Sequence, residues 1–152
     1  MRGLRLLTIR ARGRNELIRS LEEKGFTAAA AREAARRLEG EGWLDDAAAA
    51  RAFVRSRSGR YGRGRIEREL SARGFSRDAV STALSDLDAD AEERALSRLF
   101  ARVRQATAGL DPQARRQRIW NSLARRGFPA AAISAIMKGW SGGGLQDRDD
   151  IG

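Results

Sequence analysis

The sequence predicts an all-α protein of three tandem three-helix repeats that form an elongated, curved array. One pattern occurs three times along the chain, and apolar residues recur at helical spacing on both sides of each copy. Charged residues make up 33% of the sequence and hydrophobic residues 41%. This balance favours an array of small units over one large core.

Each copy of the pattern is centred on a Gly-Phe pair that follows a basic residue. With the phenylalanine as position zero, an apolar residue stands nine positions earlier and a leucine five positions earlier. The copies are Lys24-Gly25-Phe26 with Leu17 and Leu21, Arg73-Gly74-Phe75 with Ile66 and Leu70, and Arg126-Gly127-Phe128 with Ile119 and Leu123. Apolar positions four apart share one helix face. Apolar residues five, eight, nine and twelve positions after each phenylalanine extend the pattern into a second helix.

The glycine of each pair is expected to end the first of the two helices. A side chain in the left-handed conformation at this position costs about 1 kcal/mol, so glycine is favoured. The phenylalanine after it is expected to fold back onto the preceding helix. Thr27 and Ser76 suit the N-cap of the second helix, and Pro129 suits its start in the third copy.

Nine helices are expected in three repeats. In chain order they lie over 4–10, from 14 or 15 to 24, over 28–39, from 45, around Ile66 and Leu70, over 78–87, over 91–104, from 112, and up to 138. The repeats are expected to span 1–43, 44–89 and 90–140. The tail over 141–152 is glycine-rich and then acidic, and it is expected to be disordered.

The stretch 43–46 (WLDD) joins the first two repeats. Its two apolar residues before an acidic pair are typical of a hydrophobic staple and an N-cap. Other acidic pairs are interpreted in the same way, as favourable charges near helix starts and not as catalytic groups. Trp43, Trp120 and Trp140 are expected to pack at joints or in the core and not to stack on bases.

The composition excludes several kinds of site. The chain has no cysteine and no histidine, which removes disulfides, thiolate nucleophiles, imidazole bases and the commonest zinc ligands. We therefore expect no catalytic residue, no metal and no cofactor. No apolar run approaches the roughly 18 residues of a membrane span, and a cytoplasmic, monomeric protein is expected.

The net charge is +10 with a sequence pI near 11.4, and most of the cations are arginines. A G+C-rich genome would explain arginine in place of lysine but not the excess of positive charge. Arginine binds phosphate and carboxylate groups through two hydrogen bonds, so the excess indicates a polyanionic or acidic partner. The candidate partner- and DNA-binding residues are Arg51, Arg55, Arg57, Arg60, Arg63, Arg65 and Arg68. The glycines at 59, 62 and 64 are interpreted as a flexible basic turn and not as a phosphate loop.

The same region carries a second pattern, which begins at the joint and ends at the middle Gly-Phe pair. Its residues are Leu44-Asp45-Asp46, Ala50, Phe53-Val54-Arg55-Ser56-Arg57, Gly62, Arg65-Ile66, Glu69-Leu70 and Gly74. This pattern resembles the central signature of the RecX family, with weaker similarity over about 4–138. Members of that family often carry extra residues before the first repeat.

The resemblance implies three tandem three-helix repeats and a regulatory function. A RecX-like protein is expected to bind the RecA–DNA filament by lying along its groove. There it would modulate, and mainly inhibit, the recombinase, ATPase and coprotease activities of RecA. Weak binding to single- or double-stranded DNA without sequence preference is compatible with this function.

Two other functions are weighed against a RecA modulator. A helix-turn-helix-like DNA-binding protein would need arginine, asparagine or glutamine aimed at base edges. The outward positions of the second helices are Arg32, Glu33, Arg36 and Arg37 in the first copy, Asp78, Ser81, Ser85 and Asp86 in the second, and Ala131, Ser134 and Ala135 in the third. The acids and alanines among them argue against specific readout. A metal-dependent nuclease, the third hypothesis, would need converging carboxylates.

Overall fold

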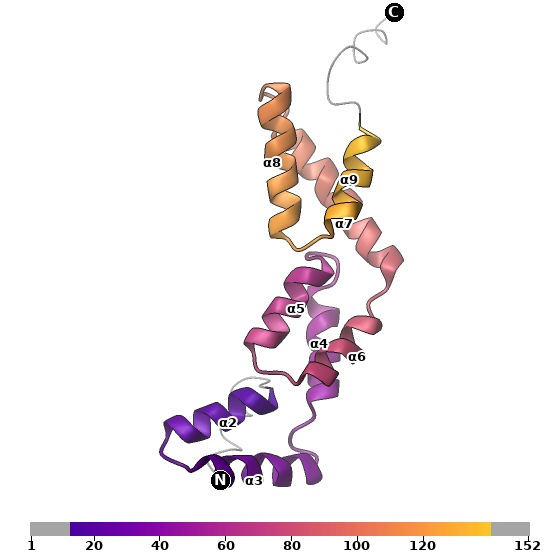
Figure 1. Ribbon diagram of the computed structural model, residues 1–152. Helices are drawn as coiled ribbons and strands as arrows, with labels where there is room; N and C mark the ends of the chain where they lie inside the picture. Colours follow the sequence, from indigo (N-terminus) through magenta and orange to yellow (C-terminus); the bar gives the residue numbers. More distant parts are fainter. Residues whose placement is uncertain (1–12, 141–152) are drawn as a thin grey trace, which may run out of the picture. The chain divides into compact units, whose positions relative to one another are not determined.

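The computed structural model describes residues 13–140, and their regular secondary structure is entirely α-helical (Figure 1). The helices are α2 (Arg14–Glu23), α3 (Ala28–Gly40), α4 (Asp46–Arg57), α5 (Arg63–Ala72), α6 (Arg77–Ser85), α7 (Ala89–Ala106), α8 (Pro112–Arg125) and α9 (Ala130–Lys138). The prediction of an all-α fold is confirmed. The helix expected over 4–10 and the tail over 141–152 lie outside the described residues.

The helices belong to two compact units. Among the described residues, the first unit comprises 13–57 and 66–87, and the second comprises 58–65 and 88–140. The first turn of α5 therefore belongs to the second unit and the remainder of this helix to the first. The repeat boundaries after residues 43, 89 and 140 stay a prediction.

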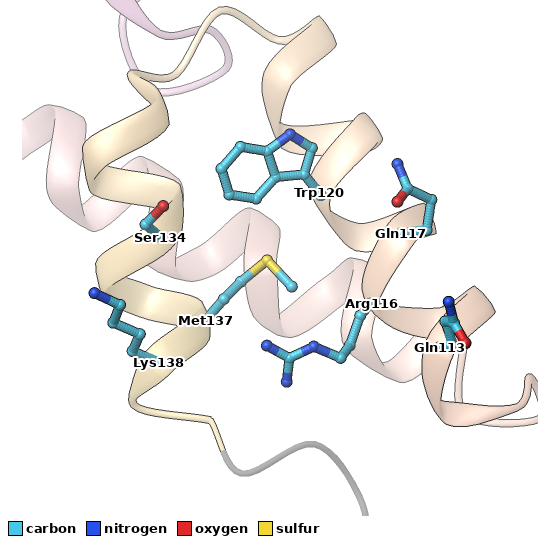
Figure 2. Close-up of a pocket in the computed structure, with 7 residues that line it drawn as sticks. All are labelled: Gln113, Arg116, Gln117, Trp120, Ser134, Met137 and Lys138. Carbon is cyan, nitrogen blue, oxygen red and sulfur yellow. The ribbon is translucent and has the colours of Figure 1, made fainter.

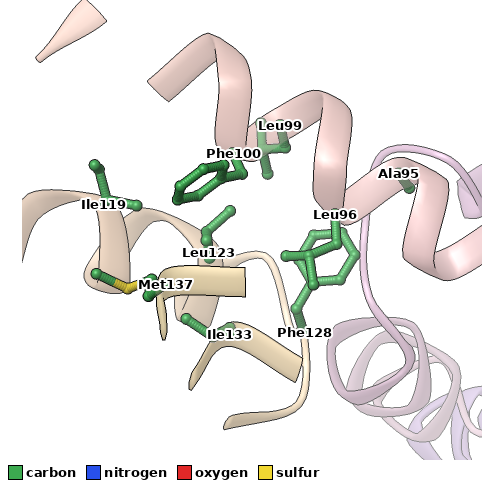
Figure 3. Close-up of a cluster of buried hydrophobic side chains, with 9 residues drawn as sticks. All are labelled: Ala95, Leu96, Leu99, Phe100, Ile119, Leu123, Phe128, Ile133 and Met137. Atoms are coloured by element: carbon green, nitrogen blue, oxygen red, sulfur yellow. The ribbon is translucent and has the colours of Figure 1, made fainter. Parts of the chain in front are cut away.

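The apolar residues that stand nine and five positions before each phenylalanine lie at the centres of the cores. Their side chains are at most 4% exposed in all three copies: Leu17, Leu21, Ile66, Leu70, Ile119 and Leu123. In the second unit, side chains from α7, α8 and α9 and the turn between α8 and α9 face one another (Figure 3). These residues are Ala95, Leu96, Leu99, Phe100, Ile119, Leu123, Phe128, Ile133 and Met137. The predicted helical register is confirmed.

Helix starts are capped as the sequence predicts. The hydroxyl oxygens of Thr27 and Ser76 accept hydrogen bonds from the backbone N–H groups of the third residue of α3 and α6. The Asp45 carboxylate accepts one from the Ala48 N–H at 3.0 Å. Each bond satisfies one of the backbone donors that a helix start leaves unpaired.

The glycine of each Gly-Phe pair has the left-handed conformation that the sequence predicts. The φ angles are +93° at Gly25, +76° at Gly74 and +85° at Gly127. Two of these turns also receive the start of another helix. The N–H groups of Gly13 and Asn15 donate to the carbonyl oxygens of Arg73 and Gly74, at 3.3 and 3.0 Å.

The turn at Gly127 receives the start of α5 through the same kind of backbone hydrogen bonds, within the second unit. The N–H groups of Gly62 and Gly64 donate to the carbonyl oxygens of Arg126 and Gly127, at 2.8 and 3.0 Å. A Cβ atom on Gly62 would lie 2.5 Å from the carbonyl carbon of Gly127, and one on Gly13 would lie 2.3 Å from that of Gly74. Both contacts join backbone directly to backbone, so they require glycine.

Phe26 does not follow the prediction made for the three phenylalanines. Phe75 and Phe128 are each 5% exposed, whereas Phe26 is 42% exposed. This difference in exposure follows the docking of helix starts on the glycine turns. In the described part of the chain, no backbone N–H group donates to the carbonyls of Lys24 or Gly25. The phenylalanine is therefore buried in the two copies that receive a docked helix start and exposed in the copy that receives none from the described residues.

Trp43 also differs from the prediction. Its side chain is 61% exposed, and only Leu44 of the expected staple is buried, at 4%. After the bend at Gly42, the N–H groups of Trp43 and Leu44 both donate to the Leu38 carbonyl oxygen, and only Leu44 reaches the core cluster. Trp120 and Trp140 do pack against the core of the second unit, as expected.

Candidate partner and nucleic-acid interface

The seven candidate arginines are divided between the two units. Arg51, Arg55 and Arg57 lie on α4 and Arg68 on α5, all in the first unit; Arg60, Arg63 and Arg65 lie in the second unit, in the α4–α5 turn and the first turn of α5. The sequence-based assignment of all seven as one set of partner- and DNA-binding residues includes residues of both units and stays a prediction.

In the first unit, an aromatic ring brings two arginines together. The guanidinium carbon of Arg57 lies 5.3 Å from the centroid of the Phe53 ring, and that of Arg73 lies 4.7 Å from it. The Arg57 Nε also lies 3.5 Å from the Glu69 Oε2. A cation held against an aromatic ring is partly ordered before a partner arrives, which reduces the entropy lost on binding.

In the second unit, Tyr61 brings together another pair. The guanidinium carbons of Arg65 and Arg126 lie 4.1 and 5.8 Å from the centroid of its ring. An Arg126 Nη atom also donates to the Arg60 carbonyl oxygen at 3.4 Å. The α4–α5 turn is thus fixed to the turn between α8 and α9 by its backbone and by its one aromatic side chain.

Arg73 and Arg126 were absent from the sequence-based set of site residues. Both are the basic residue that precedes the glycine of a Gly-Phe pair, so the repeated pattern contained the signal that identifies them. The sequence-based prediction interpreted that position as part of the turn and not as a binding residue. The structure places each guanidinium group near an aromatic ring that a candidate arginine also contacts.

Arg51 has a structural contact on the surface of the first unit. Its Nε lies 2.9 Å from the Asp86 Oδ2, with the two side chains 45% and 56% exposed. The pair joins α4 to the C-cap of α6. An exposed ion pair of this kind contributes about 0–1 kcal/mol, so Arg51 remains accessible to a partner.

The backbone amides at 62–64 of the basic turn are not available to hold a phosphate. Those of Gly62 and Gly64 donate to carbonyl oxygens of the Arg126-Gly127 turn. The Arg63 N–H donates to the Glu92 Oε1 at 2.7 Å. Anion binding by residues 62–64 therefore depends on the Arg63 side chain.

Carboxylates at the helix starts accept backbone hydrogen bonds. Asp46 accepts from the N–H groups of Arg14, at 2.9 Å, and Ser76, at 3.0 Å, and so connects three helices of the first unit. Residues 13–140 contain no group of three or more acidic side chains arranged to hold a metal ion. Nor does any helix in that range have the length and apolar character needed to cross a membrane.

Comparison with known proteins identifies the family. Residues 45–84 match the model of the second three-helix domain of RecX, and residues 90–137 match that of the third. The chain belongs to the RecX family. The expectation of tandem three-helix repeats is confirmed by these domains and by the helices described above.

Relatives in the RecX family cover most of the chain. Regulatory protein RecX of Xanthomonas oryzae pv. oryzae (strain MAFF 311018) is 40% identical over 138 residues, which is 90% of this chain and 85% of the relative. Regulatory protein RecX of Streptomyces coelicolor is 38% identical over 139 residues, 89% of this chain and 73% of the relative. These relatives are named as regulatory proteins and not as enzymes.

Solved RecX structures share the fold. The crystal structure of RecX from Lactobacillus salivarius superposes with a TM-score of 0.78 at 19% identity and covers 90% of each chain. A second crystal structure of regulatory protein RecX gives a TM-score of 0.79 at 20% identity, with 90% of this chain and 70% of the other covered.

Proposed function

We propose that this protein binds the RecA–DNA filament and modulates, mainly inhibits, the recombinase, ATPase and coprotease activities of RecA. Membership of the RecX family supports the partner. The observation that carries the proposal for this chain is the set of arginines on α4, the α4–α5 turn and α5, two of which are held against Phe53 and Tyr61.

The mechanism follows from several small units joined in one chain. Each unit that contacts the filament raises the effective concentration of the next, so several modest contacts give tight binding. Guanidinium groups bind phosphate and carboxylate oxygens with paired hydrogen bonds, which suits a surface made of protein and DNA. The bound protein opposes the entry of homologous DNA and filament growth by occupying the groove, without catalysis.

A helix-turn-helix-like DNA-binding protein that acts without RecA is the alternative. Outward positions of α6 and α9 hold few groups that read base edges, and Asp86 of the α6 set is paired with Arg51. Sequence-independent DNA binding through the arginines remains part of the main proposal. The two functions differ in whether RecA is required.

The test is the affinity for RecA filaments on single-stranded DNA, measured over a series of salt concentrations. In the triple variant Arg55→Gln/Arg63→Gln/Arg68→Gln, all three changed side chains are exposed in the structure. A well-formed charge-assisted contact contributes about 1.5–3 kcal/mol, so losing even one lowers the affinity about tenfold or more. The salt dependence is expected to become weaker as well.

The matched control is Arg19→Gln/Arg32→Gln/Arg37→Gln on α2 and α3, which removes the same charge from exposed positions of the first unit. It is expected to bind with nearly the affinity of the unchanged protein. Both variants are expected to keep the wild-type melting temperature. Full affinity and an unchanged salt dependence in the first variant would refute the assignment and favour Arg94, Arg98 and Arg102 of α7.

A further inference from the structure

A groove of about 400 Å³ lies between α8 and α9 in the second unit (Figure 2). Its lining combines aromatic, apolar, amide and cationic side chains: Gln113, Arg116, Gln117, Trp120, Ser134, Met137 and Lys138. Trp120 projects from α8 into the space between the helices, with Met137 of α9 close by (Figure 2). The volume falls within the range of about 300–1,000 Å³ typical of ligand pockets.

The groove is suited to an anion. Arg116 and Lys138 line it together, and both side chains are exposed. The whole stretch 112–138 contains no aspartate or glutamate. It does contain six cations, namely Arg115, Arg116, Arg118, Arg125, Arg126 and Lys138. Of these six, Arg116 and Lys138 line the groove, and their charge attracts phosphates and repels cationic ligands.

The aromatic residue is specific to the third copy of the repeated pattern. Eight positions before the phenylalanine, the three copies have Ile18, Glu67 and Trp120. The same position accepts a half-buried aliphatic side chain and an exposed charged one, so packing of the repeat does not require an indole. Trp120 packs against the core and is still partly exposed to the groove.

The length of α8 also distinguishes this repeat. It has 14 residues, whereas the equivalent helices α2 and α5 have 10 each. The extra turn at its start contributes Gln113 to the groove. The groove is therefore built from features that the repeated pattern does not supply.

We propose that the α8–α9 groove binds an unstacked nucleotide of single-stranded nucleic acid. The base packs on the exposed part of the Trp120 indole, while Arg116 and Lys138 neutralise the flanking phosphates. Gln113 and Ser134 offer hydrogen-bonding groups to the base edge or sugar. Paired bases in a duplex do not expose a face to the indole, so single strands are preferred over duplex.

The experiment is a titration of the full chain, without RecA, with oligothymidylate while tryptophan fluorescence is followed. It is done in a Trp43→Phe background because Trp43 is 61% exposed and would add its own signal. We expect the emission to be quenched on binding. Trp120→Leu is expected to remove the quenching and lower the affinity about 5- to 150-fold, the effect of losing one stacked base.

The rim variant Arg116→Gln/Lys138→Gln changes only exposed side chains and decides the question if Trp120→Leu does not fold. Its binding is expected to show a salt dependence lower by roughly 1.4 in log–log slope, the value for two phosphate contacts on a single strand. The proposal is overturned if folded Trp120→Leu binds as tightly as the parent, or if the rim variant keeps the full slope.

Two further measurements distinguish the proposed nucleotide binding from other causes of the quenching. Polyglutamate that quenches Trp120 as strongly as the oligonucleotide would overturn the proposal in favour of an acidic protein partner. At saturating oligonucleotide, the variant Arg55→Gln/Arg63→Gln/Arg68→Gln is expected to retain the full quenching even if its affinity is lower, because those residues do not line the groove. Loss of filament binding with intact quenching would show that the arginines bind the filament and that the α8–α9 groove binds the oligonucleotide independently of them.

Discussion

The docking of helix starts on glycine turns predicts different costs for three glycine-to-alanine substitutions. Gly25→Ala introduces a side chain at a positive φ, but no atom lies within 4 Å of the added Cβ. Its expected cost is about 1 kcal/mol. Gly13 has a φ of −72°, so Gly13→Ala has no such strain, but its Cβ would lie 2.3 Å from the backbone of the Gly74 turn.

That overlap forces the two backbones apart and breaks the hydrogen bonds from Gly13 and Asn15. Each contributes about 0.5–1.5 kcal/mol, which gives a cost of roughly 1–3 kcal/mol for Gly13→Ala. Gly74→Ala combines the positive φ with a Cβ that would lie 2.4 Å from the Glu16 nitrogen. Its expected cost is therefore roughly 2–4 kcal/mol, the sum of the two effects.

Thermal denaturation, monitored by the helical circular dichroism signal, measures these costs. For a chain of this length, each kcal/mol of destabilisation lowers the melting temperature by about 2–4 °C. The double variant Gly13→Ala/Gly74→Ala is expected to be about as stable as Gly74→Ala alone, because the docking contact is lost only once. Equal shifts for Gly25→Ala and Gly74→Ala would refute the docking explanation, and so would a double variant whose cost is the sum of the two single costs.

Two further substitutions test the fold of the first unit. Leu70→Ala is expected to cost about 2–5 kcal/mol because the side chain is fully buried, and an unchanged urea midpoint would contradict the predicted register. Asp46→Ala removes the acceptor of two backbone N–H groups and is expected to destabilise by about 1.5–3 kcal/mol or more, whereas Asp45→Ala removes one cap and costs about 1 kcal/mol. The opposite order of melting temperatures would show that Asp46 does not connect the helices.

Much of the fold could be predicted because it depends on local rules. Helical spacing identified buried positions such as Leu21 and Leu123, and glycine after a basic residue identified the turns with positive φ. Thr27 and Ser76 acted as caps because the interaction spans three residues of the same helix start. Each of these features is determined within a few residues of sequence.

The errors and omissions concern contacts between distant segments. Phe26 has the same local sequence as Phe75 but stays exposed, because burial in the other copies accompanies docking by a segment far along the chain. Asp46 fits the pattern of a cap, yet its carboxylate accepts from residues about thirty positions away in either direction. The repeated pattern marks Arg73 and Arg126 as the basic residues before the glycines, but it does not show that their guanidinium groups lie against Phe53 and Tyr61.

The most direct test of the proposed function is ATP hydrolysis by the RecA of the same organism on single-stranded DNA, with and without this protein. At a molar ratio well below one per RecA protomer, a filament modulator is expected to reduce the rate, and added free DNA is expected not to restore it. Inhibition that appears only when the protein is abundant enough to cover the DNA, and that added DNA relieves, would contradict the proposal and identify a DNA competitor.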